Sequence, residues 1–108
     1  MSKEHIEFEE SSGNVFADMG LEDADELLTR AKLGYAVRQI LHQRQLKQRE
    51  IAQLLGIKQP EVSHLLRGKY HLFSEGRLFG FLNKLDRKVI VHVEPLQKGD
   101  CPQDVVFA

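Results

Sequence analysis

The stretch QREIAQLLGIKQPEVSHLLRG, residues 48–68, decides the fold of this 108-residue chain. It contains two short runs with apolar residues at helical spacing, and Gly56 stands between them. A glycine at that place suits the left-handed residue that often ends a helix. Pro60 lies in the first turn of the second run, where a helix has no amide partner to lose. We therefore predict two short helices, at 48–55 and 59–67, joined by a tight turn.

Six positions of this stretch fit the register of a helix-turn-helix: Gln48, counted as the first, and five others whose side chains suit their places. The fifth, Ala52, is small where the second helix must cross closely, and the ninth, Gly56, makes the turn. Three further positions are apolar and would fill the angle between the helices: Ile57, Val62 and Leu65. One match would mean little, but six in register predict a helix-turn-helix with 59–67 as its recognition helix.

The charge of the chain is unevenly distributed, although its formal net charge is only −1. Residues 30–88 contain thirteen Lys and Arg against four acidic residues, a net charge of +9. Residues 1–29 carry a net charge of −8, and residues 89–108 carry −2. The basic middle predicts binding to a polyanion, and an acidic end could hold a basic partner. Alternatively, the acidic N-terminal arm lies on the basic core of the same chain, and charge alone does not separate these interpretations.

The composition is that of one small globular domain, with 42% hydrophobic and 29% charged residues. The N-terminus is polar and acidic, unlike a signal peptide, and no apolar run approaches the ~20 residues that span a membrane. The single cysteine, Cys101, cannot form an internal disulfide, so we expect a cytoplasmic protein. The five histidines are scattered along the chain: His5, His42, His64, His71 and His92. Since they lack acids or thiols at ligand spacing, we expect no enzyme activity, metal site or cofactor. The absence of a long apolar run predicts no membrane contact.

Helical and strand patterns flank the motif on both sides. Early acids followed by recurring apolar residues predict a long helix or a kinked pair at 22–44, with Gly34 as the point of bending. Ser74 is suited to be the N-cap of a further helix at 75–85. The alternating run RKVIVHVEP, rich in Val and Ile, predicts a strand at 88–94.

The motif resembles the helix-turn-helix of the XRE (lambda-repressor-like) family. With the flanking segments SSGNVFADMGLEDADELLTRAKLGYAVRQIL and FSEGRLFGFLNKLDRKVIVHVEP, residues 11–95 are similar to small XRE-type regulators that include HigA-like antitoxins. The resemblance implies an all-α, lambda-repressor-like bundle of about five helices that binds double-stranded DNA and dimerises, often with autoregulation of an operon. Lysines at 47 and 58 depart from the family, which more often has Thr or Ser there.

These two lysines stand at the start of the two short helices, where Ser, Thr, Asp or Asn is the usual cap. A cation there also opposes the positive end of the helix dipole. In a fold of this family both helix N-termini point at the DNA backbone, so each lysine would gain a phosphate partner in the complex. The alternative is that Lys47 and Lys58 are solvated side chains on imperfect caps. Four basic residues of 22–44 are interpreted as a solvated helix face, with the alternative that one or two of them assist DNA binding: Arg30, Lys32, Arg38 and Arg44.

Eleven residues are the predicted DNA contacts: Lys47, Gln48, Arg49, Lys58, Gln59, Pro60, Glu61, Ser63, His64, Arg67 and Lys69. Lys47, Gln48 and Arg49 are expected to contact backbone phosphate. Arg67 and Lys69, at the end of the recognition helix, are expected to contact phosphate or guanine. Gln59 and the exposed edge with Glu61, Ser63 and His64 are expected at base edges, since Gln pairs with adenine and Glu accepts from cytosine. Two alternatives stay open: Glu61 only complements the helix dipole, and His64 is a plain surface residue.

We divide the chain into an acidic N-terminal arm (1–20), a helix-turn-helix DNA-binding domain (21–87) and a C-terminal strand and tail (88–108). A lone strand cannot satisfy its backbone groups, so it would pair with the N-terminal arm or with a second copy. We favour a homodimer, because helical domains that bind palindromic DNA are commonly dimeric.

Two functions fit these observations. The first is a sequence-specific DNA-binding transcriptional regulator, either an autoregulating antitoxin of a type II toxin–antitoxin pair or a stand-alone phage-type repressor with no toxin. The second is a protein-interaction module that sequesters a basic partner such as a small toxin protein. The acidic residues 1–29, interspersed with apolar ones, motivate the second function.

Overall fold

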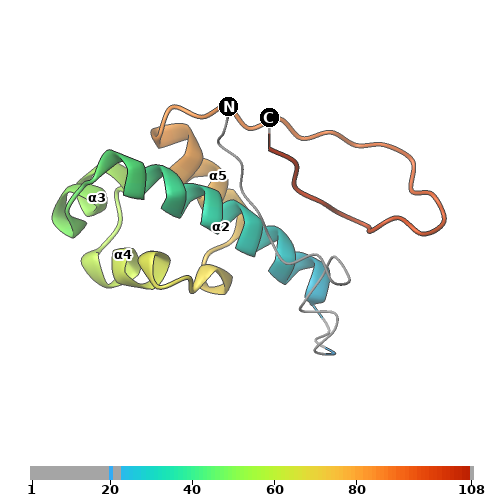
Figure 1. The fold of residues 1–108 in the computed structure, drawn as a ribbon, viewed down its shortest axis with the longest axis horizontal. Helices are drawn as coiled ribbons and strands as arrows, with labels where there is room; N and C mark the ends of the chain where they lie inside the picture. Colours follow the sequence, from blue (N-terminus) through green and yellow to red (C-terminus); the bar gives the residue numbers. More distant parts are fainter. Residues whose placement is uncertain (1–19, 21–22, 108) are drawn as a thin grey trace.

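The computed structural model describes residue 20 and residues 23–107. The predicted acidic arm, residues 1–20, therefore lies almost wholly outside the described residues. Figure 1 shows a bundle of helices from which a long C-terminal segment extends. In chain order the described elements are α2 (Ala24–Arg44), α3 (Gln48–Leu55), α4 (Gln59–Leu66), the short 3-10 helix η1 (Tyr70–Leu72) and α5 (Glu75–Lys84).

The long helix α2 crosses the bundle and packs against α5 and η1, while α3 packs against α4 (Figure 1). Phe73 and Phe81 meet edge to face inside the core, with ring centroids 5.7 Å apart. Such aromatic pairs add to the stabilisation that burial provides. The largest fully buried side chains are Phe73, Leu41, Ile51, Leu55, Leu65, Leu78, Leu85, Val37 and Val62. Every described helix thus contributes side chains to one core, and α3 and α4 are packed into the same core as the other helices.

The predicted helices are confirmed, with ends that differ by at most two residues. The first short helix has the predicted bounds, and the recognition helix α4 ends one residue early, at Leu66. Ser74 is the N-cap of α5, as predicted, because its Oγ accepts a hydrogen bond from the backbone N–H of Arg77 at 3.2 Å. The described residues thus form four α-helices and one short 3-10 helix.

Gly34 does not bend the first predicted helix, because α2 runs through it without a break. Gly34 is buried, and a Cβ atom built on it would overlap the ring of Tyr70. Glycine is therefore needed for the close approach of an aromatic ring to the helix backbone. Glycine destabilises the interior of a helix relative to alanine, and the packing of the Tyr70 ring in the place of a side chain offsets this loss.

The strand predicted at 88–94 is wrong, since these residues are described without regular secondary structure. A strand needs a partner strand for its backbone groups, and no described segment pairs with this one. The alternation of the sequence also has no buried face here. Ile90 is 75% exposed and Val93 is 88% exposed, although alternation would place them on opposite faces. The fold is therefore all-helical over the described residues.

The end of the chain returns to α2 after the extended segment (Figure 1). Lys32 Nζ lies 2.7 Å from Asp104 Oδ1, and Thr29 Oγ1 donates a hydrogen bond to Gln103 Oε1 at 2.6 Å. The hydrogen bond from Lys32 lowers the pKa of the Asp104 carboxyl. Val105 and Phe107 are partly buried and pack against the core. Both ends of the predicted C-terminal region therefore contact the bundle, since Val89 packs there too.

Candidate nucleic-acid interface

A short turn fixes α3 against α4. Gly56 adopts the left-handed conformation that was predicted, with φ of 71°, and its N–H donates to the carbonyl of Ala52 at 2.9 Å. The N–H of Ile57 donates to the same carbonyl at 3.0 Å. Lys84 Nζ, from α5, donates to the carbonyl of Leu55 at 3.0 Å. The last turn of α3 is thus held by the turn and by α5, which sets the direction in which α4 leaves.

Both short helices start at a lysine, with Lys47 and Lys58 as N-caps in extended backbone conformation. An ammonium group has no lone pair, so neither side chain accepts a hydrogen bond from the first turn. Only the acidic half of a capping box forms at each place. Glu50 Oε1 accepts from the N–H of Lys47 at 2.7 Å, and Glu61 Oε1 accepts from the N–H of Lys58 at 3.3 Å. Neither helix start therefore has a side-chain acceptor for its first-turn amide groups.

Helix α4 has one buried face and one polar face. Val62 and Leu65 have no exposed surface, and Leu66 is partly buried against the core. The helical spacing places four of the predicted contacts opposite this buried face. These are Pro60, Ser63, His64 and Arg67. Ser63 and His64 are half-buried, whereas the other two are exposed.

The remaining predicted contacts lie at the ends of the two helices. Six of them are exposed: Lys47, Gln48, Arg49, Lys58, Gln59 and Lys69. The structure therefore places exposed or half-buried polar residues along α4, and exposed ones at both helix starts and in the turn after α4. Polar residues on the helix with basic residues at its two ends suit a helix that lies in a DNA groove between two phosphate chains.

Glu61 differs from the other predicted contacts, because both of its carboxylate oxygens are engaged within the protein. Oε1 accepts from the Lys58 backbone, and Oε2 lies 2.9 Å from Nη1 of Arg77 on α5. The hydrogen bond from Arg77 lowers the pKa of the Glu61 carboxyl, and the Lys58 N–H lowers it further. This geometry favours the interpretation of Glu61 as a first-turn acid over that of a base contact.

The four basic residues of α2 have different surroundings. Arg30 pairs with Glu26 and Glu75, at 3.8 and 3.4 Å. Lys32 pairs with Asp104, and Arg44 lies 3.4 Å from Asp86 Oδ2. The predicted solvated helix face is thus partly a set of ion pairs. Arg38 is exposed and lies beside Tyr70: burial raises the pKa of the Tyr70 hydroxyl, and Arg38 opposes the rise.

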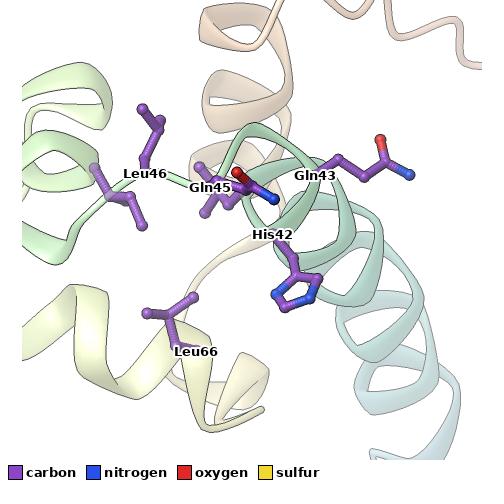
Figure 2. Close-up of a pocket in the computed structure, with 7 residues that line it drawn as sticks. His42, Gln43, Gln45, Leu46 and Leu66 are labelled. Atoms are coloured by element: carbon purple, nitrogen blue, oxygen red, sulfur yellow. The ribbon is translucent and has the colours of Figure 1, made fainter.

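A shallow hollow of about 360 Å³ opens where α2 ends beside α3 and α4 (Figure 2). Its lining residues are Leu41, His42, Gln43, Gln45, Leu46, Ile51 and Leu66. Sequence reasoning named His42 only as one of the scattered histidines and did not single out Gln43 or Gln45. Their one local signal is the polar run HQRQ at 42–45, directly before Lys47. Their approach to Leu66 of α4 depends on packing between helices, which no local pattern shows.

Comparison with protein families identifies the motif. A family described as a helix-turn-helix domain matches residues 15–94, which is most of the chain. The chain belongs to this helix-turn-helix family. The match includes α2, α3, α4 and α5, so the family relationship extends over the whole described bundle.

A solved structure, an XRE family transcriptional regulator, is similar to this helix-turn-helix protein. The two have 32% sequence identity and a TM-score of 0.70, over 80% of this chain and 97% of that chain. The XRE-type motif predicted from residues 48–68 is confirmed by these two findings. No curated protein matches the chain. The HigA-like subgroup stays a prediction, since neither match distinguishes it.

Metal sites and membrane-spanning helices are both absent from the described residues of this helix-turn-helix protein. Over the part of the chain that the structure describes, no His, Cys, Asp and Glu side chains gather in a group of three or more that could hold a metal ion. Among the same residues, every helix is too short or too polar to cross a bilayer. The polar face of α4 and the two lysine-capped helix starts are the candidate site.

Proposed function

We propose that this protein is a sequence-specific DNA-binding transcriptional regulator. The observation that carries the proposal is the arrangement of α3 and α4 in a helix-turn-helix, with lysine at both helix starts. In such a motif the second helix enters the major groove, while the first crosses the backbone. The similarity to an XRE family transcriptional regulator supports the same conclusion.

Ten of the predicted contacts serve as the DNA-binding residues in this proposal. Lys47, Gln48, Arg49 and Lys58 hold phosphates at the two helix starts. Gln59, Pro60, Ser63 and His64 meet base edges, because α4 is the helix that enters the groove. The basic residues after α4 hold the phosphates at its other end: Arg67 and Lys69. The eleventh predicted contact, Glu61, is bound within the protein by Arg77 and by the Lys58 backbone.

The direct test is selection of duplexes from a random DNA pool with the full-length protein. The expected result is one enriched sequence motif, protected from nuclease digestion in two half-sites about 34 Å apart. We propose that the protein is a homodimer, because two half-sites require two recognition helices. Sedimentation at increasing concentration measures the dimer. A pool that shows no enrichment after repeated selection would refute sequence-specific binding.

Lys58→Ser tests the role of lysine at the start of α4. Serine completes the capping box with Glu61, so the free energy of unfolding should rise by about 1 kcal/mol. DNA binding should weaken severalfold, and the logarithmic salt slope should lose about 0.9, the share of one phosphate contact. Urea denaturation and a fluorescence binding titration measure the two effects. Lys98→Ser, in the C-terminal segment, is the control and should change neither. Unchanged binding by Lys58→Ser would show that the lysine is merely solvated.

We further propose that the regulator is the antitoxin of a type II toxin–antitoxin pair and represses its own operon. The acidic composition of residues 1–29 supports this role, since it suits capture of a basic toxin. Expression together with the product of the adjacent gene tests it. The expected result is that the protein neutralises a toxic, basic ribonuclease, and that removal of residues 1–20 abolishes neutralisation but spares DNA binding. An adjacent gene with no toxic product would favour the stand-alone repressor.

A further inference from the structure

Arg77 lies near the start of α5 and is fixed from two sides. Its backbone N–H donates to the Ser74 cap at 3.2 Å. Its guanidinium lies over the rings of Phe73 and Phe81, 5.2 and 5.5 Å from their centroids. Both rings are buried, with 1% and 4% of their surface exposed, so they form a rigid platform. A planar guanidinium on such a platform has few alternative positions.

The held guanidinium acts on the first turn of α4 through Glu61. Arg77 Nη1 lies 2.9 Å from Glu61 Oε2, and the other carboxylate oxygen accepts from the N–H of Lys58. The chain of contacts therefore runs from the aromatic core through Arg77 and Glu61 to the backbone at the start of α4. Lys58 and Gln59, which follow from that backbone, are proposed DNA contacts. The directions in which the Lys58 and Gln59 side chains project therefore depend on the position of the first turn of α4.

We propose that Arg77 is a positioning residue for the recognition helix, and that Glu61 serves as its partner and contacts no base. The inference rests on the proposed DNA-binding function. Glu61 is then not a base contact, and Arg77, which lies outside the helix-turn-helix, supports DNA binding indirectly. Exposed ion pairs contribute only about 0–1 kcal/mol to folding, so variants of this pair should still fold. The consequence should appear in DNA binding, which requires that Lys58 and Gln59 are held in place before contact.

The test uses the full-length protein and the duplex obtained by selection. Arg77→Gln and Glu61→Gln should each weaken binding about fivefold, and the double variant should bind about as well as either single variant. Arg77→Lys keeps the charge but not the planar stack, so it should resemble Arg77→Gln. In all four variants the salt slope and the base preferences should equal those of the wild type. Arg30→Gln is the matched control, because it removes an ion-paired arginine from α2, and should change affinity less than twofold.

Three results would overturn the inference. A change of base preference at one position in Glu61→Gln would show that this residue contacts a base. Wild-type binding by Arg77→Lys, with a salt slope lowered by about 0.9 in Arg77→Gln, would make Arg77 a phosphate contact. Additive losses in the double variant would show that the two residues act independently. If the wild-type protein binds no duplex, the proposed DNA-binding function is refuted, and not only the role of Arg77. Circular dichroism of each protein shows that a loss of binding does not come from misfolding.

Discussion

DNA affinity is expected to fall at least 1,000-fold when salt rises from about 50 to 200 mM, for about six phosphate contacts. Each contact releases a counterion from the duplex, which gives a logarithmic slope of about −5. The basic contacts of this site are Lys47, Arg49, Lys58, Arg67 and Lys69. None of them has an acidic side-chain partner among the ion pairs of the described residues. Binding titrations at four or more salt concentrations measure the slope.

Two variants make this prediction specific to the helix starts. Lys47→Gln combined with Lys58→Gln removes two cations, so the slope should become less steep by about 1.8. Lys98→Gln removes one cation from the exposed C-terminal segment and should leave the slope unchanged. A wild-type slope near zero would contradict binding to phosphate. The same change per removed cation in both variants would mean that only the total charge of the protein matters.

Gly34→Ala is expected to lower the free energy of unfolding by about 2 kcal/mol, the usual cost of a forced overlap in a packed core. The added methyl group would overlap the ring of Tyr70, and that ring lies between α2 and the chain after α4. Alanine favours a helix by up to about 1 kcal/mol over glycine, but this gain is smaller than the cost of moving a buried ring. Urea denaturation followed by circular dichroism measures the difference.

Gly80→Ala is the matched control for this variant. Gly80 lies within α5, and apart from its chain neighbours and the helix's own nearby backbone, a Cβ atom built there meets no atom within 4 Å. The same substitution should therefore stabilise the protein by up to about 1 kcal/mol. Equal stability of the two variants would show that Tyr70 moves aside freely, and that Gly34 has no packing role.

The predicted helices depended on local signals, and these signals proved sufficient. Gly56 ends α3 because its backbone must be left-handed, and Ser74 starts α5 because its hydroxyl accepts an amide hydrogen bond. Both effects act within a few residues, so the printed sequence contains all that they need. The strand at 88–94 failed for the opposite reason. Alternation is a local pattern, but a strand forms only where a second strand supplies its hydrogen bonds.

The candidate site was predictable in part. The register of the helix-turn-helix located α4 and its polar face, because apolar spacing alone determines which side of a helix is buried. The engagement of Glu61 was not predictable, since its partner Arg77 lies on α5. The hollow beside Leu66 was missed for a related reason, because it forms where three helices meet.

The sequence by itself therefore determined the two short helices, the turn between them and the family to which they belong. The helices and the turn rest on steric and hydrogen-bonding requirements between near neighbours in the chain, and the family assignment rests on the resemblance of that motif. Only the tertiary structure decided that Gly34 receives a tyrosine ring, that Glu61 is bound to Arg77, and that the last residues return to α2. These contacts join residues far apart in sequence, and their energies depend on positions that only the packed core establishes.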